Sequence, residues 1–582
     1  MPAAPNAPYV VMEGIPPKVL LIDPVRFEAT DVIWIAPHAV FSLVSPARDA
    51  LFVLHNSCGK QETTLSIVDL RTKQIRKTVP LTPNVASLAV SQGGRCLIGV
   101  DLGGKDGSAT VNVVDTGTGA GLRIPAGHSI RQWITTRDAS RVFVLSAAKP
   151  GSAPRHSQFF SQPEIGIDAC KKAGRVYRTG ADFSVLVLDP GSAKPVATIP
   201  VPGDPSAMLL SPDERWLYVI DQGVWDKTTG GFRGAKVHSI ETQNCAMVAT
   251  RTLKTSPRAL DMDGETGELW VLAGAASPEA AGEMYRFHGS QMAGPTAVRP
   301  KPLGLVRLDG LPHPLLTTED EICQLGGDGT PQRPCIELSK LHLAQEGTAM
   351  DSHRLPRFEV RYLPTRSAFA IRTGQYGDRL IVVDPQAPQP TALLTLGRPG
   401  ARAATRVWNV ARFGQLAGLP VGPAIGAACQ HSGYGGCGIS WFWDWPKPTQ
   451  KDPWGSPPSV LGPGGRYLYT INLYTNDLAV VDTESQKVDA YFPMHAVAGA
   501  LTLLPRNRLL CMSSQRIVVL DTTTNKAVLD VVAPDIGEVD VPDGVPRIVA
   551  AFPDSVSAWD LETLKPVGTV GSLREPRVAA GQ

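Results

Sequence analysis

The sequence predicts an all-β protein built from repeated units of four short antiparallel strands. Two observations carry this prediction. Fifty-six glycines and 51 prolines are spread along the 582 residues, and because each of them interrupts regular structure, they favour short strands and tight turns over long helices. In addition, one pattern recurs along the chain: an apolar, β-branched run that ends in an acid, a short polar turn, and a second apolar run.

An acidic residue marks the turn in each copy of this pattern. LSIVDLRTKQIRKTV is a clear copy near the N-terminus, and LAVVDTESQKVDAYF is one near the C-terminus. A carboxylate at the start of a turn can accept hydrogen bonds from backbone N–H groups two residues further on, which gives the strand a physical reason to end there. The acids are Asp69, Asp115, Asp189, Asp384, Asp482, Asp521 and Asp560, with weaker copies at Asp23, Glu241 and Asp309.

A second hairpin precedes most of these acids, so each unit contains four strands. It is clearest in SAMLLSPDERWLYVIDQG, where a Pro/Asp turn joins an apolar strand to an aromatic-rich one. Neighbouring acids are 46 residues apart from Asp69 to Asp115 and 39 apart from Asp521 to Asp560. Since a lone four-stranded sheet buries its faces only against neighbours, this repeat predicts a single large β-propeller of eight blades, within a range of seven to ten.

The ends and the interruptions of the repeat complete the predicted architecture. The N-terminal strands around VLLID are expected to complete a blade with the C-terminal strands and so close the ring. Long loop insertions are expected at about 149–181, 274–302, 317–354 and 399–456, and they would form a cap if all of them left from one face. A pair of smaller propellers is the structural alternative, although no Pro/Ser-rich linker separates two halves.

The units also resemble a known repeat. SPDERWLYVIDQG and GGRYLYTINLYTNDLAVVDTESQKV resemble the YVTN-type β-propeller repeat, with its SPDG-like turn, aromatic strand and closing Asp-Thr. Propellers of this kind include scaffolding heavy chains of quinone-dependent amine dehydrogenases, lactonase-like enzymes, haem d1 and copper proteins, and surface-layer modules. The resemblance implies the fold for most of the chain outside the insertions, and it leaves the activity open.

Charge and hydropathy exclude several classes of partner. Lysine and arginine number 56 against 54 aspartates and glutamates, without a long block of one sign, so nucleic acid and anionic membrane surfaces are not expected partners. No apolar run approaches the roughly 18 residues of a membrane-spanning helix. A protein partner or a small-molecule ligand remains.

The nine cysteines favour a protein outside the cytoplasm. Cys323 and Cys335 flank one polar loop, and Cys429 and Cys437 flank another, as disulfides that staple loops would. Zinc is the rival interpretation, but there is no C-x-x-C motif and the spacings suit zinc poorly. MPAAPNAPYVV lacks the features of a secretory signal, so a periplasmic or secreted location requires a leader absent from this sequence; a cytoplasmic protein with free thiols is the alternative. Five cysteines stay unassigned: Cys58, Cys96, Cys170, Cys245 and Cys511.

Motifs of known catalytic families are absent from the sequence. It contains no G-x-S-x-G, H-E-x-x-H, Walker P-loop or C-x-x-C-H. GYGGCG matches a dinucleotide-binding pattern in letters only, since no helix can begin at the WFWDWP that follows. DMDGETGE, with Asp261 and Asp263, resembles part of a calcium loop but coincides with the turn of a blade hairpin, and the hairpin is the favoured interpretation.

Three histidines share one repeat position. His38, His128 and His495 each lie just before the first strand of a unit, which is the innermost strand of a propeller blade. If they converge at one mouth of the channel, with His55 or His313 as possible additions, they could bind copper or another transition metal. The alternative is that a polar-tolerant position collects histidines by chance.

An aromatic cluster lies in the last of the expected insertions. Trp441, Trp443 and Trp445 alternate with Phe442 and Asp444, so the three indoles share one side of an extended segment. Together with Tyr434 and Asp444 they could bind a sugar, a cofactor ring or a quaternary amine. The competing interpretation is a small core that packs the insertion onto the propeller.

Two functions remain open on this evidence. The first is an extracytoplasmic β-propeller that binds a protein partner or a small ligand on its insertion-capped face; the resemblance to amine-dehydrogenase heavy chains makes scaffolding of a redox subunit one version. The second is a metal-dependent oxidoreductase with a copper-like histidine site at the channel mouth. The first is favoured because each catalytic signal is weak.

Overall fold

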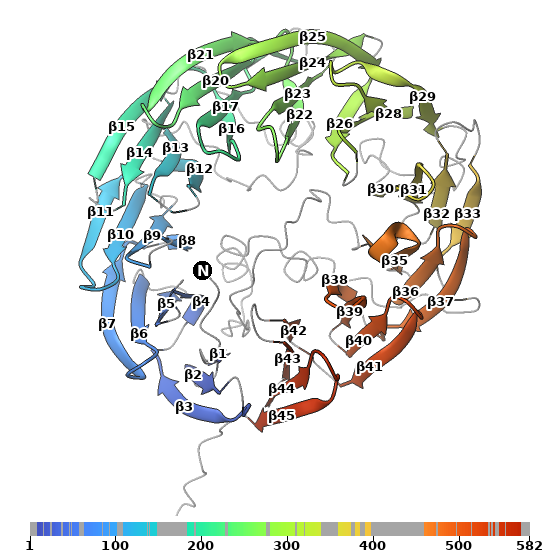
Figure 1. The fold of residues 1–582 in the computed structure, drawn as a ribbon. Helices are drawn as coiled ribbons and strands as arrows, with labels where there is room; N and C mark the ends of the chain where they lie inside the picture. The colour runs from blue at the N-terminus through green and yellow to red at the C-terminus, as the bar shows by residue number, and fades with distance from the viewer. Residues whose placement is uncertain are drawn as a thin grey trace, which may run out of the picture.

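The computed structural model describes residues 9–147, 183–338, 359–398 and 459–571, with short gaps inside these ranges. These residues form 45 strands and one 3-10 turn at Pro463–Gly465, without an α-helix among them. The strands build sheets that stand side by side in a closed ring (Figure 1). The fold is therefore all-β, and its arrangement is that of a β-propeller.

The described residues form eleven sheets of the ring, and we number them 1 to 11 in chain order. Ten of them are four-stranded and antiparallel, and sheet 1 has three strands. In the four-stranded sheets the first strand lies nearest the centre and the fourth lies at the perimeter (Figure 1). A separate two-stranded ribbon belongs to the chain between the second and third strands of sheet 5.

The first five sheets lie between residues 9 and 252. Their strands are β1 (Tyr9–Gly14), β2 (Pro17–Ile22) and β3 (Ala29–Trp34); β4 (Ala39–Val44), β5 (Ala50–Asn56), β6 (Thr63–Asp69) and β7 (Gln74–Leu81); β8 (Val85–Val90), β9 (Cys96–Asp101), β10 (Thr110–Asp115) and β11 (Gly121–Pro125); β12 (Ser129–Thr135), β13 (Val142–Ala147), β14 (Phe183–Asp189) and β15 (Lys194–Val201); and β16 (Pro205–Leu210), β17 (Trp216–Asp221), β20 (Lys236–Glu241) and β21 (Ala246–Thr252), with the ribbon β18 (Val224–Asp226) and β19 (Gly231–Arg233).

Sheets 6 to 11 complete the ring. Their strands are β22 (Pro257–Met262), β23 (Leu269–Ala273), β24 (Ala281–His288) and β25 (Gln291–Pro300); β26 (Pro302–Val306), β27 (Leu315–Thr318), β28 (Glu321–Leu325) and β29 (Pro331–Glu337); β30 (Glu359–Leu363), β31 (Ala368–Thr373), β32 (Arg379–Val383) and β33 (Ala392–Thr395); β34 (Ser459–Leu461), β35 (Tyr467–Asn472), β36 (Asp477–Asp482) and β37 (Lys487–Pro493); β38 (Ala498–Leu504), β39 (Arg508–Ser513), β40 (Arg516–Asp521) and β41 (Lys526–Val532); and β42 (Val539–Asp540), β43 (Arg547–Phe552), β44 (Ser555–Asp560) and β45 (Pro566–Gly571).

The hydrophobic core is divided among the gaps between neighbouring sheets. Eleven clusters of buried side chains each join two adjacent sheets. Middle strands such as β9 and β13 are buried at every position, because both faces of a sheet contact neighbours, whereas the perimeter strand β7 is mostly exposed. Leu20 and Ile22 of sheet 1 pack with Val549 and Val556 of sheet 11. The first and last sheets of the ring therefore share a core.

The acid at the end of the third strand caps the turn as the sequence predicts. Asp69 Oδ1 accepts hydrogen bonds from the backbone N–H groups of Arg71 and Thr72, both at 2.9 Å. Asp482, Asp521 and Asp560 accept the same pair of bonds from the residues two and three positions further on. The turn that follows is thereby fixed by the side chain that begins it.

The expected number of eight blades, within a range of seven to ten, is too low, because the described residues alone form eleven sheets of the ring. Glu241, a weak copy of the pattern, ends the third strand of sheet 5, β20, and Asp23, another weak copy, directly follows the middle strand of sheet 1, β2. Sheets 6 and 7 lack an acid at this position: β24 ends at His288, and β28 ends at Leu325 before a glycine-rich turn. Their hairpins are therefore invisible to a search for the acid.

Two of the expected insertions contain strands of the ring. Residues 274–302 include β24 and β25, and the first part of 317–354 includes β28 and β29. Among the described residues, the N-terminal strands pair with one another as sheet 1 and contact the C-terminal sheet through side chains. The expected completion of this sheet by the C-terminus stays a prediction, because residues 572–582 lie outside the described residues. The expected insertions at 149–181 and 399–456 lie outside the described residues.

The two faces of the ring carry different connections. Because successive strands are antiparallel, the link from second to third strand and the link from fourth strand to the next sheet leave from the same face. We call this the connection face, and we call the opposite one, with the hairpin turns, the turn face. Residues 148–182, 339–358 and 399–458 all join strand ends on the connection face: β13 to β14, β29 to β30 and β33 to β34.

Candidate functional site

Most of the predicted binding residues lie outside the described residues. This applies to the aromatic cluster and its second cysteine pair, and to two of the three histidines of the predicted metal site. Their roles as a ligand site, a disulfide and metal ligands stay predictions. The residues concerned are Tyr434, Trp441, Trp443, Asp444, Trp445, Cys429, Cys437, His38 and His128.

The third predicted metal ligand, His495, lies on the connection between β37 and β38. It follows β37, a perimeter strand, and its side chain is exposed. Asp530, on the perimeter strand β41, has a lowered pKa because Arg516 donates hydrogen bonds to it, and the charge of His495 adds to this effect. His495 is therefore close enough to Asp530 for its charge to act on that carboxylate, and its role as a metal ligand stays a prediction.

The two additional histidines do not share a site with His495. His55 is 4% exposed, and its Nε2 lies 2.9 Å from the hydroxyl of Ser66 on the neighbouring strand, inside sheet 2. His313 lies between β26 and β27, and its ring is 5.7 Å from that of Trp270. This position belongs to the turn face, opposite the connection that carries His495.

The acidic segment at Asp261 and Asp263 is a hairpin turn, as the favoured interpretation predicts. Asp263 Oδ1 accepts hydrogen bonds from the backbone N–H groups of Glu265 and Thr266 at 2.9 and 2.8 Å. Arg307 of sheet 7 donates to Asp261 at 2.8 Å and to Asp263 at 2.9 Å. Both carboxylates therefore bind a guanidinium that links sheets 6 and 7.

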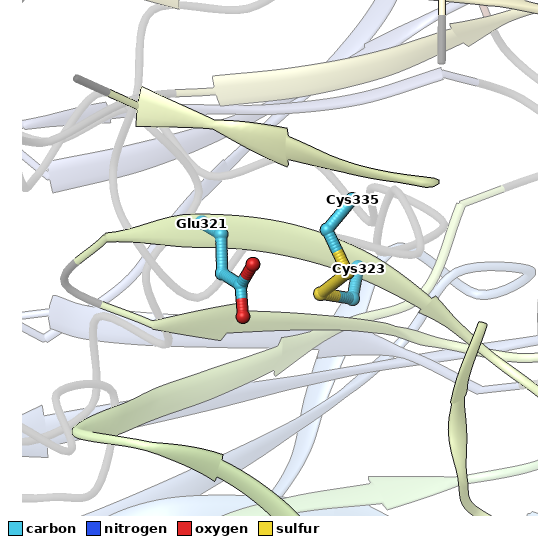
Figure 2. A group of neighbouring side chains, drawn as sticks. All are labelled: Glu321, Cys323 and Cys335. Carbon is cyan, nitrogen blue, oxygen red and sulfur yellow. A yellow bond between two sulfur atoms is a disulfide. The ribbon is translucent and has the colours of Figure 1, made fainter. Parts of the chain in front are cut away.

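A disulfide and a carboxylate form a group that could hold a metal ion (Figure 2). Cys323 of β28 and Cys335 of β29 are joined by the predicted disulfide, with an S–S distance of 2.10 Å. Glu321 of β28 lies beside them, and one ligand atom from each of the three residues lies within 4.8 Å of the other two. As long as the sulfurs are bonded to each other, they are not thiolate ligands.

Arg299 of sheet 6 holds the carboxylate of this group. Its Nε lies 2.7 Å from Glu321 Oε1, and both side chains are largely buried, at 29% and 18% exposure. Cys323 is 1% exposed, whereas Cys335 lies on the perimeter strand and is partly exposed. The sequence revealed the disulfide through its cysteine spacing, but no local signal pointed to Glu321 or Arg299.

A polar cavity of about 400 Å³ lies between sheets 2 and 3 on the turn face. It is lined by Asp49, Arg76, Arg95 and Asp115 together with the backbone of the turn at Gly117. Arg76 Nη2 lies 2.6 Å from Asp69, and hydrogen bonds from the Thr118 N–H and hydroxyl lower the pKa of Asp115. Asp49 accepts a hydrogen bond from the Ser45 hydroxyl at 2.6 Å, so each charged group of the lining except Arg95 has a hydrogen-bond partner within 3 Å.

The innermost strands are linked to each other by polar side chains. Gln132 of β12 donates to the carbonyl of Met208 at 2.9 Å and accepts from its N–H at 2.6 Å. Arg361 of β30 donates to the hydroxyl of Ser459 on β34 at 3.1 Å. These bonds join neighbouring sheets at their inner edges and add directional contacts to the apolar cores.

Comparisons with known proteins show distant neighbours among the solved structures. No protein-family model matches the sequence, and no curated protein is similar to it. Among solved structures, hydrazine synthase of Kuenenia stuttgartiensis is 14% identical, with 48% of this chain and 76% of that chain covered and a TM-score of 0.27. Dihydro-heme d1 dehydrogenase NirN is 16% identical, with 68% and 74% covered and a TM-score of 0.30.

The β-propeller domain of the trilobed protease from Pyrococcus furiosus is 11% identical, with 60% of this chain and 93% of that domain covered and a TM-score of 0.27. These scores are too low to carry an argument about activity. No helix among the described residues is both long enough and apolar enough to span a membrane.

Proposed function

We propose that this protein is an extracytoplasmic β-propeller that binds a protein partner or a small ligand on its connection face, with scaffolding of a redox subunit as one version. One observation carries the proposal: every chain segment longer than about fifteen residues between successive strands joins strand ends on that face. In proteins, long connections on a rigid frame are the usual carriers of binding function.

Among the described residues, the turn face carries no connection of comparable length between strands. Its hairpin turns are short, and their acids accept hydrogen bonds from their own backbone, as at Asp69, Asp482 and Asp521. A carboxylate that is saturated in this way has less capacity to bind a partner. The contrast between the faces supports the connection face as the binding surface.

The frame itself is suited to a scaffold. A separate apolar cluster joins each pair of neighbouring sheets, and polar bonds such as those of Gln132 join the innermost strands. The disulfide Cys323–Cys335 supports the extracytoplasmic part of the proposal, because disulfides persist in oxidising compartments.

The proposal is tested by comparing two variants in affinity purification from the native host. In the first, a short Gly/Ser linker replaces residues 400–457 on the connection face. In the second, Arg95→Glu changes a side chain that is 86% exposed near the turn-face cavity. A partner or ligand that is retained by the wild type and by Arg95→Glu but lost from the linker variant, as measured by mass spectrometry, would support the proposal. A partner or ligand that is lost from Arg95→Glu but retained by the linker variant would contradict it.

Metal analysis separates this function from the oxidoreductase alternative. Protein purified without a histidine tag is expected to lack stoichiometric copper. Stoichiometric copper that disappears in His128→Ala would favour the alternative instead.

A further inference from the structure

The group formed by Glu321, Cys323 and Cys335 holds three ligands, one carboxylate and two sulfurs, that suit a divalent cation such as Zn²⁺. Thiolates bind Zn²⁺ at about 2.3 Å and carboxylate oxygens bind it at about 2.0–2.2 Å, and three protein ligands plus one water complete a tetrahedral site. The ligand atoms already lie within 4.8 Å of one another. The residues come from two adjacent strands of sheet 7, as Figure 2 shows.

The backbone at this point can accommodate a change in the distance between the sulfurs. Ile322 pairs with Ile336 and Gln324 pairs with Gln332, so a single residue of β28, Cys323, faces three residues of β29. This is a bulge, and its residues lie outside the regular hydrogen-bond ladder. The sulfurs would have to separate to about 3.7 Å, the distance of two thiolates on a tetrahedral Zn²⁺. A bulge allows this movement with less disturbance than a regular pair.

The surrounding charges fit a bound divalent cation. Arg299 Nε contacts Glu321 Oε1 at 2.7 Å, which leaves Oε2 to bind a metal and fixes the orientation of the carboxylate. Two thiolates and one carboxylate carry three negative charges, and Arg299 together with the divalent ion carries three positive ones. A neutral set of this kind is favourable where most of its members are buried.

We propose that reduction of the Cys323–Cys335 disulfide converts this group into a binding site for Zn²⁺ or a similar soft cation. A dithiol reductant supplies two electrons and two protons, so the S–S bond breaks, two thiols form and the reductant becomes a disulfide. Metal binding then releases the two thiol protons. The disulfide form excludes the metal, so the redox state of this pair of strands controls the site. Cys335, on the perimeter strand, is the sulfur that the reductant can reach.

The experiment uses the full chain and Co²⁺ as a spectroscopic probe for Zn²⁺. After treatment with a dithiol and its removal under anaerobic conditions, the protein should bind one Co²⁺ at this site, with the absorption of thiolate-to-cobalt charge transfer. The same protein without reduction should not show this absorption. Cys335→Ser should abolish it, and Glu321→Gln should weaken binding at least about 10-fold.

Two controls keep the result specific. The double variant Cys429→Ser/Cys437→Ser removes the other predicted pair and should keep the cobalt signal. Glu337→Gln removes the carboxylate at the position that pairs with Glu321 across the strands, outside the candidate group, and should leave the affinity unchanged. Thermal unfolding of each oxidised variant checks that the sheet is intact.

Unchanged cobalt binding in Cys335→Ser, or equal affinities for Glu321→Gln and wild type, would overturn the proposal. So would the absence of a charge-transfer band in the reduced wild type. The two proposals share the Cys323–Cys335 disulfide, but the metal site includes none of the connection-face segments, so cobalt binding and partner binding are measured and can fail separately.

Discussion

At the scale of single residues, the most regular feature is the aspartate that ends the third strand. Its role was predictable because the chemistry is local: the carboxylate and the N–H groups that it binds are two and three residues apart, as in Asp69 with Arg71 and Thr72. Contacts between sheets were not predictable. Arg307 binds Asp261 from 46 residues away, and no short pattern in the sequence encodes that distance.

The first prediction concerns the pH dependence of stability. Backbone hydrogen bonding from Thr72 and the side-chain contact with Arg76 lower the pKa of Asp69 to about 2. Since the unfolded value is about 3.9, the stabilisation is present above about pH 4 and is lost as the pH falls towards 2. Asp69→Asn should therefore flatten the decline of the urea midpoint between pH 5 and pH 2. Asp320→Asn, at a side chain that is 73% exposed, is the control and should leave the curve unchanged.

The second prediction concerns the guanidinium between sheets 6 and 7. Arg307 and its two carboxylate partners are 15–17% exposed, so Arg307→Met would leave two negative charges facing each other with little water. We expect a loss of about 2–4 kcal/mol in the free energy of unfolding, measured with denaturant. Arg95→Met removes an exposed guanidinium 3.9 Å from Asp115 and should cost less than about 1 kcal/mol. Equal losses in the two variants would refute this account.

At the scale of strands and their connections, hairpins with an acidic turn were predictable and hairpins with other turns were not. Sheet 6 turns at Gly289, with φ of 60°, and the N–H of this residue binds the hydroxyl of Tyr218 at 2.8 Å in the neighbouring sheet. At this turn the tyrosine hydroxyl from the neighbouring sheet accepts the backbone hydrogen bond that an aspartate carboxylate accepts in the other turns, and glycine supplies the positive φ. Residues 274–302 therefore resemble a loop in sequence although they form two strands.

The third prediction tests a connection that requires glycine. Gly203, between β15 and β16, has φ of 106°, and a Cβ atom there would lie 1.9 Å from Asp221 Oδ2. Asp221 is 1% exposed and accepts the N–H of Asp204 at 3.0 Å, so it has little freedom to move. Gly203→Ala should lower the free energy of unfolding by more than about 2 kcal/mol.

Gly234 supplies the matched control. Its φ is 72°, and a Cβ atom there would meet nothing within 4 Å. Gly234→Ala should therefore show the backbone cost alone, about 1 kcal/mol. If the two variants unfolded at the same denaturant concentration, the contact with Asp221 would have no role in fixing this connection.

At the scale of the whole molecule, the ring closes through sheets 1 and 11, and sheet 1 has three strands where every other sheet has four. Asp23 follows β2 and accepts the N–H of Arg26 at 2.7 Å, as the acids after third strands do, so β1, β2 and β3 correspond to the second, third and fourth strands. The position without a strand among the described residues is the innermost one. The repeat predicted the closed ring, but it could not determine how many sheets fill it, because that number depends on the angle between neighbouring sheets.

The last prediction is that the C-terminal residues supply this innermost strand. After β7, β15 and β37, the next sheet begins four or five residues beyond the last residue of the perimeter strand. The same spacing after β45, which ends at Gly571, reaches residues 575–576, so the innermost strand would begin in the segment EPRVAA at 575–580. Truncation after Gly571 should therefore lower the Tm by several degrees and speed amide exchange in β1, measured by hydrogen–deuterium exchange. Deletion of residues 1–8 is the control and should change neither. Unaltered exchange in β1 after the C-terminal truncation would mean that the ring closes through side-chain packing between sheets 1 and 11 alone.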